Sequence, residues 1–344
     1  MAAQDGAAAL QMRLAATLAT NGDVNVTVIQ LLKTQGDGKE SVVLAEKESA
    51  LLINIIKGRR LEEADLITDR KALAALCTLH VSMKWLAARC QGLRYISPRA
   101  IDMMEGNNNS DSQQQNGGGQ ASHQNSHHHS RRWTTSTHNL SNAPIGAYLP
   151  LDQQTATAFD AVLVSFTELS TLVLRTLHID IRLHLLHGIY AAMDTTYKLS
   201  QPYNDPDPAI LALSTSLSSY TATVSTHLLP RQYDFLVQNI HVLVNNALCS
   251  LVHCIQQMDD YGNARMQLNV LVLQQCIKNF DSKASLERAA RFYELAEQGP
   301  EAVVAQGKGE GYAVEDLKAL VRLCWRPERD AVKGGVDEFV GRLG

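Results

Sequence analysis

Apolar side chains recur at steps of three and four along much of the chain, a spacing typical of amphipathic helices. One such stripe predicts a helix from about Asp69 to Leu93. Residues 42–57 predict another helix, which ends before Gly58. The valine-rich run at 24–32 alternates like a strand at first, but the sequence offers no second strand to pair with it. We therefore expect that run to be helical as well.

The patterns after residue 200 predict more helices. Asp207 is a suitable N-cap and Pro208 a suitable first residue, so a helix is expected to begin there and to close at Pro230. Residues 232–258 carry two adjacent apolar stripes. So wide an apolar face predicts a single, mostly buried helix over this range.

Two further helices are expected near the carboxy terminus. The first passes through 286–293 and ends at Gly299-Pro300, because glycine permits a left-handed cap and proline prevents continuation. The second, which passes through 314–324, is the last one that we predict. Between them, the stretch AQGKGEGYA (305–313) lacks both the Lys-Ser/Thr ending and the preceding strand of a phosphate-binding loop. We interpret it as an interhelical loop.

Together these elements favour an all-α fold of stacked antiparallel helices joined by short turns. A polar stretch at 106–132 interrupts them, and because Ala121 is its only apolar side chain we predict a long disordered insertion. The expected organisation is a flexible tail at 1–20, a helical segment at 21–104, a disordered low-complexity linker at 105–146, a helical-bundle domain at 147–330 and a tail at 331–344.

Charge and cysteine content narrow the classes of function. The chain of 344 residues has 31 basic and 35 acidic side chains, a net charge of −4, which disfavours nucleic-acid binding. Its six cysteines form no CxxC pair and lie mostly among apolar neighbours, as buried free thiols in a reducing compartment do. Polar residues interrupt the first 20 positions before a signal-peptide core forms. The richest apolar windows contain charged side chains, so no transmembrane segment is expected.

Two groups of residues could bind a metal ion. His123 and the run His127–His129 lie in the low-complexity stretch, which cannot enforce a coordination geometry. In HIDIRLHLLH, Asp180 and His184 lie one helical turn apart and His187 follows three residues later. These three could be metal ligands in an enzyme, but hydrogen bonds in helix packing are the better account. Neither group leads us to predict a metal site.

The sequence offers no catalytic constellation, since HExxH, GxSxG and paired catalytic carboxylates in a suitable frame are missing from it. We expect neither an enzyme nor a cofactor. Arg131 and Arg132 precede Thr134 at the edge of the low-complexity stretch, a pattern that basophilic kinases read. Phosphorylation of Thr134 would place a charge beside these two arginines.

Several long stretches resemble a known family. They are Thr68–Lys71 running to Met83–Leu86, residues 131–134, AYLPLDQQTATAFDAVLVSFTELSTLVLRTLHIDIR (147–182), DPDPAILALSTSL (205–217), RMQLNVLVLQQCIKN (265–279) and ARFYELAEQGPEAVV (290–304). In these stretches the chain is similar to the fourth component of the exocyst complex, the Sec-eight subunit, in its fungal form. The resemblance covers most of 66–330.

This resemblance implies an elongated rod of helical bundles and a non-enzymatic role in an octameric tether. Such a subunit helps to dock secretory vesicles at the plasma membrane before SNARE-mediated fusion. The implied partners are the other exocyst subunits and, indirectly, small GTPases and the SNARE machinery. The implied location is cytoplasmic, peripheral at plasma-membrane sites of polarised secretion. The family chain is much longer, so we expect a carboxy-terminal portion; a free-standing all-α adaptor or small-GTPase effector is the alternative.

Overall fold

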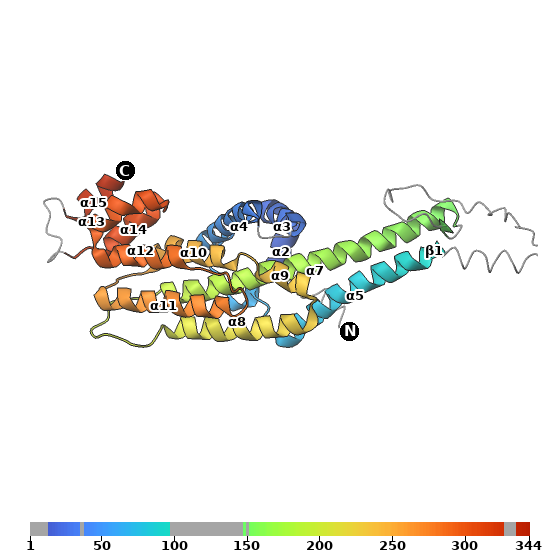
Figure 1. Cartoon of the computed structure of the whole chain (residues 1–344), viewed down its shortest axis with the longest axis horizontal. Coiled ribbons are helices and arrows are strands. Elements are labelled where there is room, and N and C mark those ends of the chain that lie inside the picture. Colours follow the sequence, from blue (N-terminus) through green and yellow to red (C-terminus); the bar gives the residue numbers. More distant parts are fainter. Residues whose placement is uncertain (1–12, 35–37, 97–146, 149–150, 327–334) are drawn as a thin grey trace, which may run out of the picture. The chain divides into compact units, whose positions relative to one another are not determined.

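The computed structural model describes residues 13–34, 38–96, 147–148, 151–326 and 335–344. These residues are helical apart from turns, loops and short β pairings, which confirms the all-α prediction. The chain divides into two compact units, one of Met1–Leu79 with Leu172–Gly344 and the other of His80–Thr171. Two helices, α5 (Arg70–Arg94) and α7 (Gln153–Met193), contribute residues to both units (Figure 1).

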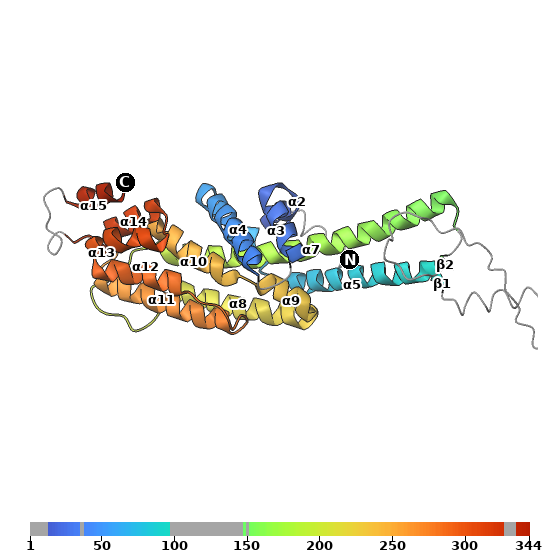
Figure 2. The same ribbon diagram turned by 45° about the horizontal axis from the view of Figure 1, so that its top comes forward.

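The first unit begins with the helices that the sequence predicts. Helix α3 (Gly22–Thr34) packs against α4 (Lys39–Gly58), and α4 packs in turn on α10 (Ile240–Ser250) (Figures 1 and 2). The helices predicted over 42–57 and from about Asp69 to Leu93 are confirmed as α4 and α5, and α5 begins at Arg70. The elements before α5 are α2 (Leu14–Thr20), α3 (Gly22–Thr34), α4 (Lys39–Gly58) and the 3₁₀ turn η1 (Glu63–Asp65).

The second half of α7 is the centre of the first unit's core. Every residue from 176 to 186 is buried, so this part of the helix is enclosed on all sides rather than along one stripe. The apolar side chains among residues 176–186 make up most of the core around this part of α7. The polar members, which cannot reach water here, must find partners within the protein.

The next two helices confirm one prediction and correct another. Helix α8 (Pro208–His227) begins as expected, with the Asp207 carboxylate accepting a hydrogen bond from the Ala209 amide. The single helix predicted over 232–258 is wrong. The structure has α9 (Pro230–Val237), α10 (Ile240–Ser250) and the 3₁₀ turn η2 (Val252–Cys254) in its place. Asn239, with φ 56°, lies at the break.

The last part of the first unit is a set of shorter helices. Helix α11 lies between α8 and α12, and α12, α11 and α8 run side by side in both views (Figures 1 and 2). Helix α12 ends at Gly299, with φ 96°, and Pro300 begins α13, as predicted. These elements are α11 (Asp260–Lys278), α12 (Glu287–Gln298), α13 (Pro300–Gln306), the 3₁₀ turn η3 (Gly307–Glu310), α14 (Val314–Cys324) and α15 (Val336–Leu343).

The glycine-rich stretch at 305–313 joins α13 to α14 through η3, as an interhelical loop. Helix α14 is not the last helix, because α15 follows it with Phe339 and Leu343 buried. The six cysteines all lie among the described residues and form no disulfide there, and four of them are buried.

The second unit is a helical hairpin made of α5 from His80 onward and α7 up to Thr171. A short antiparallel pair, β1 (Tyr95–Ile96) and β2 (Ala147–Tyr148), closes it with Tyr95 opposite Tyr148. His80 Nδ1 lies 2.7 Å from the Ser170 carbonyl oxygen. The predicted disordered insertion lies outside the described residues.

One helix in the described part of the chain, α7, is long and apolar enough to cross a membrane by length and composition alone. Of its most apolar stretch of 18 residues, a share of 17% is buried inside the protein. Core helices of proteins without a membrane span pass the same test, so this finding is weak. The expectation that no segment spans a membrane stays a prediction.

Candidate functional site

Four polar side chains of α7 are buried in succession and form what we call the polar seam: His178, Asp180, Arg182 and His184. Alternate residues along a helix lie on different faces, so these side chains meet different neighbours. His178 and Arg182 meet α4 and the α9–α10 break, while Asp180 and His184 meet the segment before α5.

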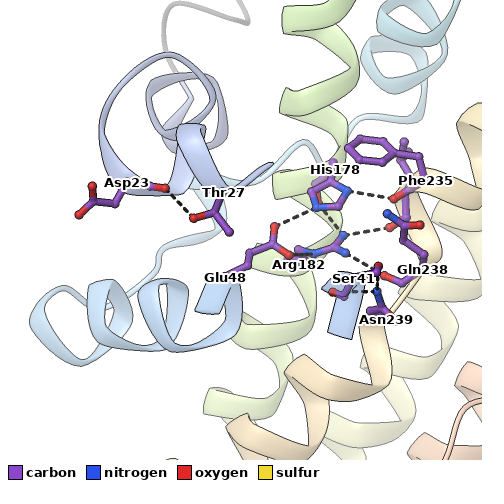
Figure 3. A network of polar contacts seen from close by, with 10 residues as sticks. Asp23, Thr27, Ser41, Glu48, His178, Arg182, Phe235, Gln238 and Asn239 are labelled. Atoms are coloured by element: carbon purple, nitrogen blue, oxygen red, sulfur yellow. Dashed lines mark hydrogen bonds and ion pairs between the residues drawn. The ribbon is translucent and has the colours of Figure 1, made fainter. Parts of the chain in front are cut away.

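Glu48 of α4 is the partner shared by the first pair. Its Oε1 lies 2.8 Å from His178 Nε2, and its Oε2 accepts a hydrogen bond of 2.9 Å from Arg182 Nε (Figure 3). All three side chains are at most 3% exposed. A buried carboxylate of this kind requires cationic or hydrogen-bonding partners, and here both of its oxygens have one.

The guanidinium of Arg182 explains why the helix breaks between α9 and α10. Its Nη1 donates to the carbonyl oxygen of Leu236 at 2.9 Å, and its Nη2 donates to that of Gln238 at 3.0 Å (Figure 3). In a continuous helix these carbonyls would accept from backbone amides four residues later. Side chains of α7 take the place of those amides, so the chain turns here without leaving the carbonyls unpaired.

The break is also held from α4. The Asn239 side-chain amide donates to the Ser41 hydroxyl at 2.8 Å, and that of Asn246 donates to the Ser49 hydroxyl at 3.2 Å. Asparagine tolerates the left-handed conformation that position 239 adopts. The polar seam therefore joins α4, α7 and the α9–α10 break through side chains that are far apart in the sequence.

The ionisation of this cluster follows from its surroundings. Burial alone would raise the pKa of Glu48, but the charge of Arg182 and the contacts with His178 outweigh it and lower this pKa to about 2. Burial and the neighbouring Arg182 charge lower the pKa of His178. A neutral imidazole has one N–H, so it can donate either to Glu48 or to the Phe235 carbonyl, 3.0 Å from Nδ1, but not to both.

The second pair of the polar seam fixes the segment that leads into α5. The Asp180 carboxylate accepts a hydrogen bond of 3.0 Å from the Ile67 amide, and His184 Nε2 lies 3.3 Å from the Ile67 carbonyl oxygen. Within the described ranges, no cationic side chain lies as close to Asp180 as Arg182 lies to Glu48, since His184 Nε2 is 3.6 Å from Asp180 Oδ2. Burial raises the pKa of Asp180.

Asp180 and His184 make the hydrogen bonds that the helix-packing interpretation expects. His187 is half-buried and lines, with His184, a cavity of about 390 Å³ beside α8. Among the described residues, no group of three or more His, Cys, Asp or Glu side chains could hold a metal ion. That Asp180, His184 and His187 bind no metal ion stays a prediction. Thr134 and the histidines at 123 and 127–129 lie outside the described residues.

Glu48 is not among the residues predicted from the sequence, although the sequence contains a signal for it. Ala45, Leu52 and Ile56 lie on one face of α4, and position 48 falls on that same face. A glutamate within a buried stripe requires a buried partner, and the apolar second half of α7 contains two arginines that could supply it, Arg175 and Arg182.

The chain matches no family model. It is 33% identical over 312 residues to the probable exocyst complex component sec8 of Neurospora crassa, a match that covers 88% of this chain and 26% of the relative. The chain is homologous to the exocyst component Sec8. This confirms the resemblance predicted from the sequence.

More distant Sec8 relatives extend the match beyond the fungi. The chain is 22% identical to human exocyst complex component 4 over 284 residues, which cover 79% of this chain and 25% of the human protein. It is 22% identical to exocyst complex component sec8 of Schizosaccharomyces pombe over 209 residues, or 56% of this chain and 19% of the relative. The chain thus spans about a quarter of the length of the first two of these Sec8 relatives.

Proposed function

We propose that the chain is a non-enzymatic part of the exocyst, the assembly that tethers secretory vesicles at the plasma membrane before SNARE-mediated fusion. The observation that carries this proposal is the 33% identity with the Neurospora crassa relative over 312 residues. A match of that length covers helix faces and turns throughout the chain, rather than one short motif that could arise by chance.

The polar seam supports a role as a rigid scaffold. It joins α4, α7 and the α9–α10 break through buried, charge-assisted hydrogen bonds, which depend strongly on geometry. A tether needs surfaces held at fixed positions more than it needs reactive groups, and packed helices supply them. We propose the other exocyst subunits as direct partners, and small GTPases and the SNARE machinery as indirect ones.

We further propose that the protein is cytoplasmic and lies peripherally at plasma-membrane sites of polarised secretion. A fluorescent fusion expressed from the native locus tests this location. We expect the signal to concentrate at growing or secreting regions of the cell surface and to disperse when secretory vesicles are depleted. A uniform cytoplasmic signal in growing cells would contradict the proposed location.

Immunoprecipitation of the native protein tests the proposed assembly. An antibody raised against residues 208–330 should recover the other exocyst subunits, identified by mass spectrometry, and excess antigen should abolish their recovery. Recovery of the bait without any of these subunits would overturn the proposal. In that case the free-standing adaptor or small-GTPase effector becomes the better account.

A pair of matched variants links the assembly to the fold. Glu48→Ala removes the shared partner of the polar seam, whereas Glu46→Ala alters an exposed glutamate of the same helix. If the folded bundle is what the subunits bind, Glu48→Ala lowers their recovery per bait molecule and Glu46→Ala does not.

A further inference from the structure

The outward face of α11 carries an apolar row that nothing in the described part of the chain covers. Tyr261, Ala264, Leu268 and Leu271 follow one another at steps of three, four and three. Tyr261 is 47% exposed and Leu271 is 52% exposed. Large apolar side chains that line up on an exposed helix face mark a surface that another helix can cover.

Helix α12 places an acidic row along one side of this apolar row. Glu287, Glu294 and Glu297 are exposed, and with Ala290 they follow the same steps of three, four and three. The two helices run antiparallel, because Gln267 donates to Glu297 at 2.9 Å while the Leu286 amide donates to Gln274 Oε1 at 2.9 Å. The acidic row therefore accompanies the apolar row along its length.

The two rows form the walls of an open groove of about 430 Å³, lined by Ala264, Leu268, Leu271, Ala290 and Glu294 among others. We call this feature the α11 groove. Its apolar wall and its acidic wall belong to different helices. An occupant therefore meets apolar side chains on the α11 side and Glu294 on the α12 side, whose carboxylate also accepts a hydrogen bond of 3.2 Å from Arg291.

The flank of α11 that faces away from α12 packs against α8, which is uncharged over most of its length. Helix α8 runs parallel to α11 there, since Asp207 contacts Asn269 and Ser214 contacts Cys276. From Pro208 to Thr226 this helix carries no charged side chain, and Leu211 is 46% exposed. Helix α8 itself therefore adds no charge to this flank, whereas α12 adds three glutamates to the other.

We propose that the α11 groove docks a basic amphipathic helix of a partner protein. The apolar row requires apolar side chains at the same helical spacing, and the acidic row requires lysine or arginine on the flank that faces α12. The inference uses only this surface and does not rest on the proposed membership of the exocyst.

Charge disfavours the two other occupants of such a groove. An anionic membrane surface at the groove would meet Glu287, Glu294 and Glu297 and be repelled, because Arg288 and Arg291 of the same helix contact Gly311 and Glu310. A second copy docked through the same face in a two-fold contact would bring one acidic row towards the other. Both remain distinguishable outcomes of the experiment below.

Site-specific photo-crosslinking in the cells that produce the protein tests the proposal. A benzophenone amino acid replaces Leu271, and a control chain carries it at Lys47, an exposed position on α4. We expect Leu271 to give a crosslink whose partner peptide, sequenced by mass spectrometry, has net positive charge and apolar residues at steps of three and four.

Charge reversal supplies the matched comparison. Glu294→Lys with Glu297→Lys should lower the crosslink yield about tenfold, which corresponds to about 1.4 kcal/mol. Glu40→Lys with Glu46→Lys, on the exposed side of α4, should leave it unchanged, and melting temperatures show whether each variant is folded.

Several results would overturn the inference. They are a crosslink to a second copy or to lipid, a partner peptide that is acidic or not amphipathic, a yield at Leu271 no higher than at Lys47, and a yield that charge reversal does not change. Co-precipitation of exocyst subunits is measured separately, so failure of the groove and failure of the proposed assembly give different results.

Discussion

At the scale of single residues, two buried carboxylates of the first unit show how neighbours set ionisation. Glu48 has Arg182 and His178 within hydrogen-bonding distance, and its pKa falls to about 2. Asp180 is equally buried but has an amide and a more distant histidine as partners, and its pKa rises. The Glu48 charge is stabilised by folding, whereas the Asp180 charge is opposed by it.

Replacing Glu48 by glutamine should destabilise the protein strongly, because Arg182 would remain buried without its counter-charge. Breaking a buried ion pair on one side costs about 3–5 kcal/mol. Urea unfolding followed by circular dichroism measures the change in the free energy of unfolding. Glu46→Gln, an exposed change on the same helix, should leave that free energy within about 0.5 kcal/mol. Equal unfolding midpoints for the two variants would contradict this role of Glu48.

The contribution of Glu48 should disappear in acid. Its pKa is lowered in the folded state, so the unfolded state takes up the proton first, near its ordinary value of 4.5. The stabilisation is therefore complete above about pH 4.5 and is lost as the pH falls towards about 2. We expect the difference in unfolding free energy between the natural protein and Glu48→Gln to shrink steadily between pH 5 and pH 3. A difference that stays constant over this range would exclude the assignment.

Asp180→Asn should not destabilise the protein, in contrast to Glu48→Gln. The raised pKa means that ionised Asp180 costs stability at neutral pH, whereas asparagine keeps an oxygen for the Ile67 amide without the charge. We expect the free energy of unfolding at pH 7 to change by less than about 1 kcal/mol. Asp180→Leu, which removes the acceptor, should lose about 1–3 kcal/mol and serves as the contrasting variant. A large loss for asparagine itself would show that the carboxylate charge is required.

At the scale of elements, the break between α9 and α10 shows what the sequence could predict and what it could not. Both apolar stripes predicted over 232–258 are buried, which confirms the prediction of the buried face of this segment. The helix is nevertheless interrupted, because the carbonyls of Leu236 and Gln238 are paired with Arg182 from α7. Local periodicity reports which side of a segment is buried. It contains no information about a side chain some 50 positions earlier.

The caps were predictable because their signals are local. Asp207 and Pro208 begin α8 and Gly299 ends α12 where the sequence places them. The polar seam was anticipated as hydrogen bonding in helix packing, since polar residues inside an apolar helix require partners. Its main partner, Glu48, was missed, because one sequence does not show which buried stripes face each other.

The entry into α11 depends on the absence of a side chain at Gly262. A Cβ atom built there would lie 1.8 Å from the carbonyl oxygen of Tyr197, whose segment pairs with the chain just before α11. Gly262→Ala should therefore lower the free energy of unfolding by about 1–3 kcal/mol. Gly92→Ala on α5, where a Cβ meets open space, should be neutral or stabilising by up to about 1 kcal/mol. If both variants unfold at the same urea concentration, the close approach at Tyr197 is not a constraint.

At the scale of the whole molecule, the two units differ in how much they bury. The first encloses the second half of α7 on all sides, whereas the described side chains of the second include only three that are buried: His80, Ala156 and Ser170. Helical hydrogen bonds open more readily where few apolar contacts hold the helix in place. The two units should therefore differ in local stability.

Hydrogen–deuterium exchange followed by mass spectrometry measures this difference. We expect amides of α5 from 80 to 92 to exchange at least about tenfold faster than those of α10 from 240 to 250. Helix α12, which packs on α10, α11 and α14, should resemble α10 and serves as the internal reference. Equal protection of α5 and α10 would mean that contacts outside the described residues hold the hairpin.

The direction of the chain gives the α9–α10 break a consequence for biosynthesis. The side chains that contact its carbonyls, His178 and Arg182, and their partner Glu48 precede the break and leave the ribosome before it. A growing chain can therefore have its donors in place before Leu236 and Gln238 emerge, and these carbonyls can pair as they appear. Separated from the preceding residues, the segment 230–250 would keep both apolar stripes without the donors that interrupt it. As a free peptide it would favour one continuous helix.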